Sequence, residues 1–339
     1  MNWRLLLAPL SPIYWCVTAL RNLAFSCGLF SSAKFSRPVI CIGNITVGGT
    51  GKTPLTEHVL RSLAHRHVAV VSRGYGRKTS GLLVASPLST ADQIGDEPCQ
   101  MKHKFPAADV VVCANRAEAI SLAFDSLSAD VVVMDDGMQH RSVSPSFVVM
   151  VCDFARPIWS DITLPAGDLR EPWSARLRAD VVVVNKCPVD LSVAQADAVR
   201  RNLKLRPSQK LFFCSIGYAH NYSALYNCDA VSDFVSRPAL ALAGVGRPQP
   251  FFDEVASRHA VVRSLAFPDH HVFAPDDVSR IQAALDALGP DALLVTTEKD
   301  AMRLPPISGH PVVCLPITIH FLFDGQSLFD SLIAEAASH

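Results

Sequence analysis

The stretch "PVICIGNITVGGTGKTP" (residues 38–54) decides the fold of this chain. Its first part, "PVICIG", is a continuous apolar run, which is typical of a strand buried on both faces of a sheet. The segment "TVGGTGKT" (46–53) follows with three glycines and a Gly-Lys-Thr ending. A strand, a glycine-rich turn and a helix form the context of a phosphate-binding loop. The sequence therefore predicts a P-loop NTPase-like domain.

The loop departs from the usual G-x-x-x-x-G-K-[ST] pattern because Thr46 stands at the position of the first glycine. We expect Lys52 to reach the β- and γ-phosphates and Thr53 to bind Mg²⁺. Pro54 is tolerated because N–H groups in the first turn of a helix have no intrahelical partner. The predicted nucleotide-binding loop comprises Thr46, Val47, Gly48, Gly49, Thr50, Gly51, Lys52 and Thr53.

Composition limits the class of protein. A chain of 339 residues is long enough for two modest domains, and an apolar content of 49% argues against disorder. The 31 basic residues balance 31 acidic ones, which gives no basic footprint for nucleic acid. The ten cysteines include no C-x-x-C pair, which favours a reducing compartment over a disulfide scaffold or a zinc site.

The N-terminus contains the uncharged segment "LLLAPLSPIYWCVTAL" (5–20). Its 16 residues fall short of the roughly 20 needed to cross a bilayer, and two prolines interrupt it. A secretory signal is conceivable, but no A-x-A-like cleavage site stands out. We expect residues 1–34 to rest on a membrane, with Tyr14 and Trp15 at the interface. A buried core helix is the alternative. The cations expected to face anionic headgroups are Arg4, Arg21, Lys34 and Arg37.

Short β-branched runs alternate with helical stretches after residue 37, which predicts an α/β fold with a mostly parallel sheet. A break at 204–235 separates a second α/β set, which includes a helix at 276–288 and a final helix. We therefore expect a P-loop domain at 35–225, a smaller α/β lobe at 226–339 and a cleft between them. The predicted strands of the first set are 38–43, 68–72, 109–113, 130–137, 147–153 and 180–186, and its helices are 54–64, 116–127 and 191–202.

Two strand ends carry polar residues that suit nucleotide chemistry. "VVVMDDG" ends in Asp135 and Asp136, which match the acids that hold Mg²⁺ in P-loop enzymes, although an acidic turn is the simpler alternative. "VVVVNKCPVD" places Asn185 and Lys186 where guanine-reading proteins carry N-K-x-D. Pro188 replaces the Asp of that motif, which favours adenine over guanine; a plain strand-end turn remains the other reading.

Two loops place titratable residues side by side. "GDEP" contains Asp96 and Glu97 before a predicted helix, where helix capping is the simpler explanation. "FPDHH" contains Asp269, His270 and His271, which in isolation favour a surface loop. The segment "SRGYGR" (72–77) places two arginines around two glycines and suits either an anionic group or a turn.

The ordered set of motifs resembles one family. "TVGGTGKTP", "SRGYGR", "GDEP", "DDGMQH", "LPAGDLREP", "GVGRPQPFF", "FPDHH" and "TTEKDAMRL" occur in the order found in the tetraacyldisaccharide 4′-kinases, the lipid A 4′-kinases of Gram-negative bacteria. The resemblance covers roughly residues 5–315. It also accounts for Thr46, since the loop of that family lacks the first glycine. Met138 and Asp168 depart from its motifs and leave local loop shape open.

The resemblance implies ATP-dependent phosphorylation of the 4′-hydroxyl of an acylated disaccharide 1-phosphate, forming lipid IVA at the cytoplasmic side of the inner membrane. It implies Asp96 as catalytic base with His270, and Lys52 as the phosphate-binding lysine. The metal site would comprise Thr53, Glu97, Asp135 and Asp136. Residues of the cleft would be Arg73, Arg77, Arg116, Gln139, His140, Arg170 and Glu171. The expected cofactors are ATP and Mg²⁺, and the expected partners are the lipid A precursor and the membrane surface, with no nucleic acid and no obligate protein partner.

Two other classes of function stay open at this point. A metallochaperone-type GTPase or ATPase also uses a glycine-rich GKT loop on a parallel sheet, and the "NKCP" segment speaks against it. A non-catalytic membrane scaffold with a degenerate loop is the third class. The intact Lys52, Thr53 and Asp135 argue against that class.

Overall fold

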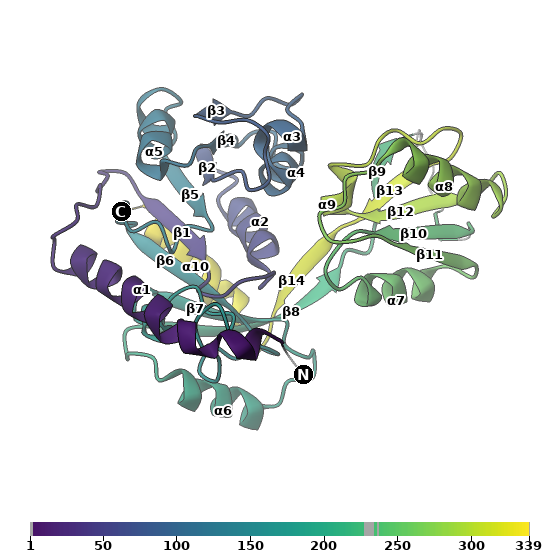
Figure 1. Cartoon of the computed structure of the whole chain (residues 1–339). Helices are drawn as coiled ribbons and strands as arrows, with labels where there is room; N and C mark the ends of the chain where they lie inside the picture. The colour runs from purple at the N-terminus through teal and green to yellow at the C-terminus, as the bar shows by residue number, and fades with distance from the viewer. Residues whose placement is uncertain (1–2, 227–233, 236, 339) are drawn as a thin grey trace.

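The computed structural model describes residues 3–226, 234–235 and 237–338. Figure 1 shows a larger lobe around a nine-stranded sheet, a smaller lobe around a five-stranded sheet, and the strands β8 and β14 that run between them. The predicted α/β class is confirmed. Of the ten cysteines, the nine that lie within the described part of the chain are unpaired, and Cys228 lies outside it.

The nine-stranded sheet has the order β14-β8-β7-β6-β1-β5-β2-β4-β3. Neighbouring strands are parallel except at the two edges, where β14 pairs with β8 and β3 with β4 in antiparallel fashion. The strand that feeds the P-loop, β1, is therefore central. The bounds are β1 Val39–Gly43, β2 Val68–Ser72, β3 Leu83–Val84, β4 Asp109–Val112, β5 Val131–Asp135, β6 Phe147–Asp153, β7 Val181–Asn185, β8 Lys210–Tyr218 and β14 Ile317–Phe321.

Helices cover both faces of this sheet, so the strands need no polar face. In β1, Val39 and Cys41 enter one apolar cluster, while Ile40 and Ile42 enter the cluster on the opposite face. This arrangement explains the continuous apolar runs in the sequence. One face carries α5 (Arg116–Asp125) and α6 (Val193–Leu203), and the other carries α2 (Lys52–Ser62), α4 (Asp96–Lys104) and α10 (Gln326–Ala336). Two short helices complete the lobe: α3 (Ala91–Ile94) precedes α4, and η2 (Trp173–Arg178) precedes β7.

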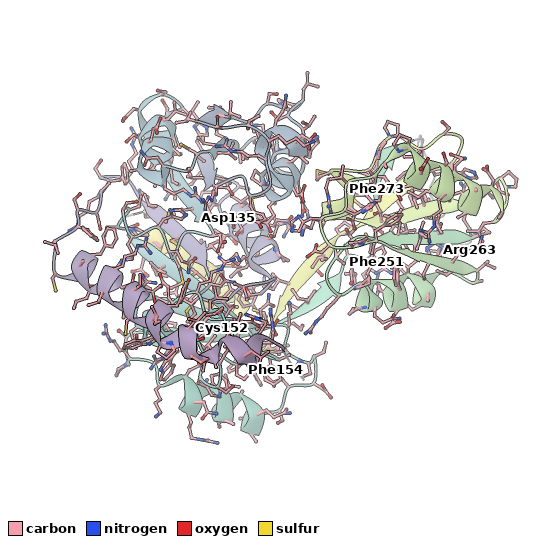
Figure 2. The ribbon with its side chains drawn as sticks, in the orientation of Figure 1. Asp135, Cys152, Phe154, Phe251, Arg263 and Phe273 are labelled. Carbon is pink, nitrogen blue, oxygen red and sulfur yellow. The ribbon has the colours of Figure 1, made fainter. Side chains whose placement is uncertain are left out.

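The smaller lobe has the strand order β11-β10-β12-β13-β9, parallel except for the antiparallel edge strand β9. Two apolar clusters lie on its two faces; Figure 2 labels Phe251 in one and Phe273 in the other. The bounds are β9 Ser223–Tyr226, β10 Ala239–Ala243, α7 Gln249–Arg258, β11 Val262–Ala266, α8 Pro275–Asp286, β12 Leu293–Thr297, α9 Glu298–Ala301 and β13 Val312–Leu315.

The last strand and helix pack on the larger lobe. The sequence had instead predicted that all of residues 226–339 form the smaller lobe. Strand β14 pairs with β8, from Ile317 opposite Tyr218 to Phe321 opposite Cys214. Helix α10 packs Phe329 into the apolar cluster that also holds residues of α2. The sequence did not reveal this, because strand–helix alternation does not say which sheet a strand joins. The smaller lobe is an insertion between β8 and β14, and its expected start adjoins residues 227–233, outside the described part.

The N-terminal segment forms the short helix η1 (Trp3–Leu10) and then α1 (Ser11–Ser26). Within the described ranges, none of the helices combines the length and hydropathy needed to cross a bilayer. Helix α1 lies along the surface of the larger lobe (Figure 1), and Ser11 is its one buried residue. The alternative of a buried core helix is therefore wrong. The exposed apolar side chains of this segment are Leu6, Leu10, Ile13, Trp15, Val17, Leu20 and Leu23.

Candidate active site

The P-loop follows β1, and α2 begins at its Lys52. Gly51, immediately before the helix, has φ 86°, a left-handed conformation that favours glycine. A Cβ at Gly51 would also lie 2.1 Å from Nδ2 of Asn185, which excludes any side chain. Asn44 closes the loop from inside, because its Nδ2 donates to Oγ1 of Thr50 at 3.1 Å. The loop shape is therefore fixed by local geometry.

Asn185 and Lys186 lie against the P-loop rather than in a separate base pocket. Nδ2 of Asn185 donates to the carbonyl oxygens of Thr50 (3.2 Å) and Gly51 (3.3 Å). Nζ of Lys186 donates to the carbonyl oxygen of Gly49. These contacts give the two predicted nucleotide-binding residues a direct role in holding the loop backbone.

Two residues that the sequence reasoning missed complete this support. Asp153 ends β6 and is buried; its Oδ2 lies 3.1 Å from Nζ of Lys186 and 3.3 Å from Nη2 of Arg156. Arg156 in turn donates to the carbonyl oxygen of Val47 at 3.4 Å. The loop carbonyl groups are engaged on this side, and the N–H of Val47 donates to the carbonyl oxygen of Asp168 at 2.8 Å, so the glycine-rich part of the loop is the part that would meet an anion. In the sequence, the sign that could have pointed to Asp153 was its place as an acid at the end of the strand "FVVMVCD".

Asp135 ends β5, the neighbour of β1, with Ile42 opposite it in the sheet. Its side chain is buried in the larger lobe (Figure 2), and Oδ1 has no hydrogen-bond partner among the described residues. Burial, and next the nearby Glu97 and Asp136, raise the pKa of Asp135 to about 7. A buried carboxylate oxygen without a partner, among other acids, is a place for a cation.

Asp136 contacts two cations. Its Oδ1 lies 3.3 Å from Nζ of Lys52, and its Oδ2 lies 3.1 Å from Nη1 of Arg170. Burial by itself would raise the pKa of Asp136, but the ion pairs with Lys52 and Arg170 outweigh it and hold the pKa below its usual range. The predicted phosphate-binding lysine and one predicted metal-binding acid are thus in direct contact.

Asp135 and the acids near it suit a Mg²⁺ ion that is also bound by phosphate oxygens. In the described part of the chain, no group of three His, Cys, Asp or Glu side chains converges as a closed metal site. Mg²⁺ usually takes one or two carboxylates and fills its other positions with phosphate oxygens and water. The unpartnered Oδ1 of Asp135 fits that demand, with Thr53 in the first turn of α2 as the second predicted ligand.

Asp96 and His270 meet across the two lobes. Asp96 is the first residue of α4, and its Oδ2 lies 3.0 Å from Nδ1 of His270, in the loop between β11 and α8. Asp96 is 13% exposed and His270 is 45% exposed. His270 has φ 58°, which is uncommon for a residue with a side chain. A carboxylate in contact with an imidazole that remains open to solvent is an arrangement for moving protons.

Two cations of the smaller lobe, Lys299 and Arg303, surround this pair. Nζ of Lys299 lies 3.0 Å from Nε2 of His270, and Nε of Arg303 lies 3.6 Å from Oδ2 of Asp96. Both belong to the motif "TTEKDAMRL", whose sequence alone does not indicate a role for either residue. The buried carboxylate of Asp300 holds Arg303 in place: its Oδ1 lies 2.7 Å from Nη2 of Arg303, and its Oδ2 accepts a hydrogen bond from the N–H of Gly244.

Apart from Arg170, which contacts Asp136, the residues expected to line the cleft divide into two groups. Gln139 lies at the base of the P-loop, because its Nε2 donates to the carbonyl oxygen of Asn44 at 2.7 Å. Arg73 is exposed, and Arg77 donates to the carbonyl oxygen of Gly81 at 2.6 Å. Burial, followed by repulsion from Arg116 and Arg73, lowers the pKa of His140 to about 4.

The second group is buried. Arg116 is 1% exposed and donates to the carbonyl oxygen of Cys113, and burial lowers its pKa to about 10. Glu171 is also 1% exposed and pairs with Arg178. Burial raises the pKa of Glu171, although Arg178 opposes this. Among the described residues, Nε of Arg116 and Oε1 of Glu171 have no hydrogen-bond partner, so the expected role of both side chains in the cleft stays a prediction.

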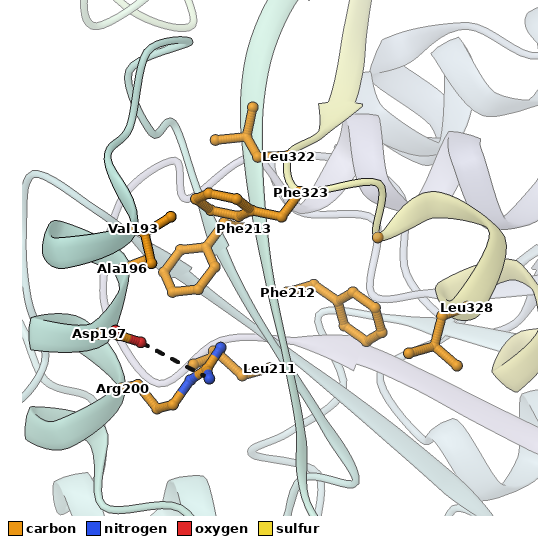
Figure 3. Close-up of a pocket in the computed structure, with 11 residues that line it drawn as sticks. Val193, Ala196, Asp197, Arg200, Leu211, Phe212, Phe213, Leu322, Phe323 and Leu328 are labelled. Atoms are coloured by element: carbon orange, nitrogen blue, oxygen red, sulfur yellow. Dashed lines mark ion pairs between the residues drawn. The ribbon is translucent and has the colours of Figure 1, made fainter.

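The pocket in Figure 3 lies elsewhere, between α6, β8 and the start of α10. Its volume is about 290 Å³, and aromatic and aliphatic side chains such as Phe213 and Phe323 form its walls. Its charged residues, Asp197 and Arg200, pair with each other at 4.0 Å. None of the predicted site residues lines this pocket, so the candidate site rests on the loops around β1 and β5.

A P-loop on a central parallel strand, acids at the next strand end and a carboxylate–imidazole pair define a P-loop phosphotransferase. Comparison with known proteins narrows this class. The chain belongs to the tetraacyldisaccharide-1-P 4′-kinase family, whose model matches residues 3–337.

Individual relatives agree with this membership over nearly their whole length. The tetraacyldisaccharide 4′-kinase of Porphyromonas gingivalis is 40% identical over 347 residues, which cover 98% of this chain and 97% of the relative. That of Bacteroides thetaiotaomicron is 38% identical, covering 96% and 91%. The crystal structure of LpxK from Aquifex aeolicus in complex with ATP superimposes with a TM-score of 0.78 at 26% identity, covering 98% of this chain and 99% of that one.

Proposed function

We propose that this protein transfers the γ-phosphoryl group of ATP to the 4′-hydroxyl of a tetraacyl disaccharide 1-phosphate, forming lipid IVA. Family membership gives the reaction type and the lipid acceptor. The P-loop gives the donor, and the structure of a relative with ATP supports that donor. A metallochaperone-type NTPase or a membrane scaffold would not need the pair described next.

The contact between Asp96 and His270 carries the proposal. A sugar hydroxyl is a poor nucleophile near neutral pH, so a carboxylate within hydrogen-bond reach must accept its proton as the new bond forms. The 3.0 Å contact with His270 orients the Asp96 carboxylate, and Lys299 orients the far side of the imidazole. Because Asp96 and His270 come from different lobes, this geometry exists only when the lobes are together.

Donor activation is assigned to residues around the P-loop. Lys52 would exchange Asp136 for the β- and γ-phosphates, since phosphates offer the ammonium more negative charge than one carboxylate. Thr53, Asp135, Asp136 and Glu97 would hold Mg²⁺ directly or through water. The metal, when bound, neutralises charge on the transferring phosphoryl group. Arg170, already 3.1 Å from Asp136, would add a second positive charge.

The acceptor has four acyl chains, so we propose that the protein works at a membrane surface, on the cytoplasmic side of the inner membrane. The exposed apolar face of η1 and α1 supports this. The other side of α1 is held by the larger lobe: the hydroxyl of Tyr14 donates to the carbonyl oxygen of Arg170 at 3.0 Å. The same Arg170 contacts Asp136, so the surface helix and the metal-binding acids are linked through one residue.

The direct test is phosphorylation of the lipid. Purified protein in detergent micelles with Mg²⁺-ATP and tetraacyl disaccharide 1-phosphate should yield a product one phosphate heavier by mass spectrometry. The Lys52→Ala variant is the matched control and should give no product, because it loses the phosphate-binding charge. No product from the wild-type chain would overturn the proposed function. Full activity of Lys52→Ala would overturn the assignment of the P-loop.

A further inference from the structure

A buried ion-pair network joins the lobes at Lys104, the last residue of α4. Nζ of Lys104 donates to Oε2 of Glu57 in α2 and to Oε1 of Glu298 in α9. The side chains of Lys104, Glu57 and Glu298 are 22%, 2% and 10% exposed. We call these three residues the lobe-bridging triad. It connects the P-loop helix, the helix that begins with Asp96, and the smaller lobe.

The remaining oxygens of the triad are also engaged. Oε1 of Glu57 accepts from Nε2 of Gln100 at 2.8 Å, and Oε2 of Glu298 accepts from the N–H of Ile317 at 3.0 Å. Ile317 opens β14, one of the two strands that run between the lobes. The triad therefore lies where the smaller lobe is joined to the larger one, and all four of its carboxylate oxygens have donors.

The charges of the triad make its geometry depend on Lys104. One cation faces two carboxylates that approach the same ammonium group. Burial, and next the charge of Glu298, raise the pKa of Glu57, while Lys104 opposes both. Arg61 adds a fourth charge at 3.1 Å from Glu57, but it lies on α2 itself and is 45% exposed. Without Lys104, the two carboxylates would face each other across the lobes and repel.

The smaller-lobe element held by the triad carries the partners of the catalytic pair. Lys299 follows Glu298 directly in α9 and contacts His270, and Arg303, just beyond this helix, lies 3.6 Å from Asp96. We propose, on the basis of the kinase function above, that Lys104 is a positioning residue. It holds α9 against α2 and α4 so that His270 meets Asp96 in the reactive arrangement.

The Lys104→Met variant tests this role, since it keeps the aliphatic stem and removes the charge. We expect kcat for lipid phosphorylation to fall by about 10- to 100-fold, the cost of misplacing reacting groups by about an ångström. The KM for ATP should stay within about twofold, because the P-loop is untouched. Backbone amide hydrogen exchange in detergent should accelerate at 268–272 and 298–303, where the lobes meet, and stay unchanged in β1 and β10.

Two further variants separate positioning from general stability. Arg61→Met removes a cation from the same Glu57 without touching the link between lobes, so its kcat and exchange should match wild type. Adding Glu298→Gln to Lys104→Met should restore most of the kcat. The new amide can donate to Glu57 while its oxygen still accepts from Ile317, and the like-charge repulsion is gone.

The proposal is overturned if Lys104→Met keeps wild-type kcat and wild-type exchange at 268–272 and 298–303. It is also overturned if exchange accelerates equally in β1 and β10, since that would mean plain destabilisation, or if Arg61→Met has the same effect as Lys104→Met. Hydrogen exchange needs no turnover. Failure of the wild-type chain to phosphorylate lipid would therefore count against the proposed function alone, and the exchange data would still decide the role of the triad.

Discussion

At the scale of single residues, variants of Asp96 and His270 distinguish an effect on the reaction of the lipid acceptor from an effect on nucleotide binding. Asp96→Asn keeps the size of the side chain and removes the proposed base, so we expect kcat to fall by about 10²- to 10⁴-fold with little change in the KM for ATP. His270→Gln should also lower kcat, because it removes the group that orients the carboxylate. Steady-state kinetics at saturating lipid with varied ATP measure both effects.

Asp92→Asn serves as the matched control for Asp96→Asn. Asp92 is an exposed acid close by in the chain, and it pairs with Lys78 on the surface. Its loss should leave kcat unchanged. If Asp96→Asn and His270→Gln instead raised the KM for ATP and kept kcat, the two residues would belong to the donor site.

The lowered pKa of His140 predicts that the folding stability of the protein depends on pH. Burial, Arg116 and Arg73 lower its pKa from 6.5 to about 4, so the folded protein holds this ring neutral where the unfolded chain would protonate it. Between pH 6.5 and 4 the unfolded state therefore binds more protons, and folding stability falls as the pH falls. A ¹H–¹³C NMR titration should show one imidazole with a midpoint near pH 4 that is missing in His140→Gln. That variant should also lose less stability between pH 7 and 4.5.

The placement of residues could be predicted from the sequence where a motif spans consecutive elements. The P-loop and the strand-end acids of "VVVMDDG" were located, since strand, loop and helix must follow each other in the chain. The contacts of Asp153, Arg156 and Lys104 with other elements could not be predicted, because they depend on which elements are neighbours. For the same reason, the burial of Glu171 and the contact of Lys299 with His270 could not be predicted from the sequence.

At the scale of elements, α1 has two different sides. One side is held to the segment 163–170, where Ser11 and Thr163 exchange hydrogen bonds at 2.8 and 3.1 Å. The other side exposes large apolar residues to solvent. The apolar character of this segment could be predicted from the sequence, but the division into two sides could not, since its apolar residues occur all round the helix.

The exposed side predicts membrane binding that can be removed without unfolding. Ile13, Val17 and Leu20 lie on one helical face and are 61%, 60% and 65% exposed. Changing all three to serine removes apolar area worth about 1.5–3 kcal/mol per fully buried side chain, so affinity for vesicles should fall at least 10²-fold. Flotation with vesicles of phosphatidylethanolamine and phosphatidylglycerol measures this.

The control for the α1 variant replaces exposed apolar residues elsewhere. Leu88 and Val189 are 89% and 80% exposed and lie outside α1. Their replacement by serine should leave flotation unchanged. Equal loss in both variants would show that binding is not a property of α1, and undiminished flotation of the triple variant would refute the surface-helix proposal.

At the scale of the whole molecule, α10 makes the end of the chain part of the larger lobe. Phe329 is fully buried among Phe212, Phe321 and His58. Phe329→Ala should therefore lower the free energy of unfolding of the larger lobe by about 3–5 kcal/mol. Urea unfolding followed by tryptophan fluorescence reports on this lobe alone, because the four tryptophans precede the insertion; they are Trp3, Trp15, Trp159 and Trp173.

Leu328→Ala is the control on the same helix, since Leu328 is 54% exposed, and it should change stability by less than about 1 kcal/mol. Had α10 packed on the smaller lobe, as the expected range 226–339 implied, Phe329→Ala would leave the fluorescence transition unchanged. The fold class of both lobes could be predicted from strand patterns. The return of β14 could not, because its pairing with β8 bridges about a hundred residues of insertion.

The link between the lobes has a mechanical consequence. Strands β8 and β14 are hydrogen-bonded to each other from Ile317 and Tyr218 to Phe321 and Cys214, so the lobes are joined by a two-stranded ribbon rather than by one flexible chain. A ribbon bends readily across its flat face, but it resists stretching and sideways displacement, because those would break its ladder of hydrogen bonds. We therefore expect the smaller lobe to swing along one arc once the contacts of the lobe-bridging triad open. Such a swing would return His270 to Asp96 along the same path.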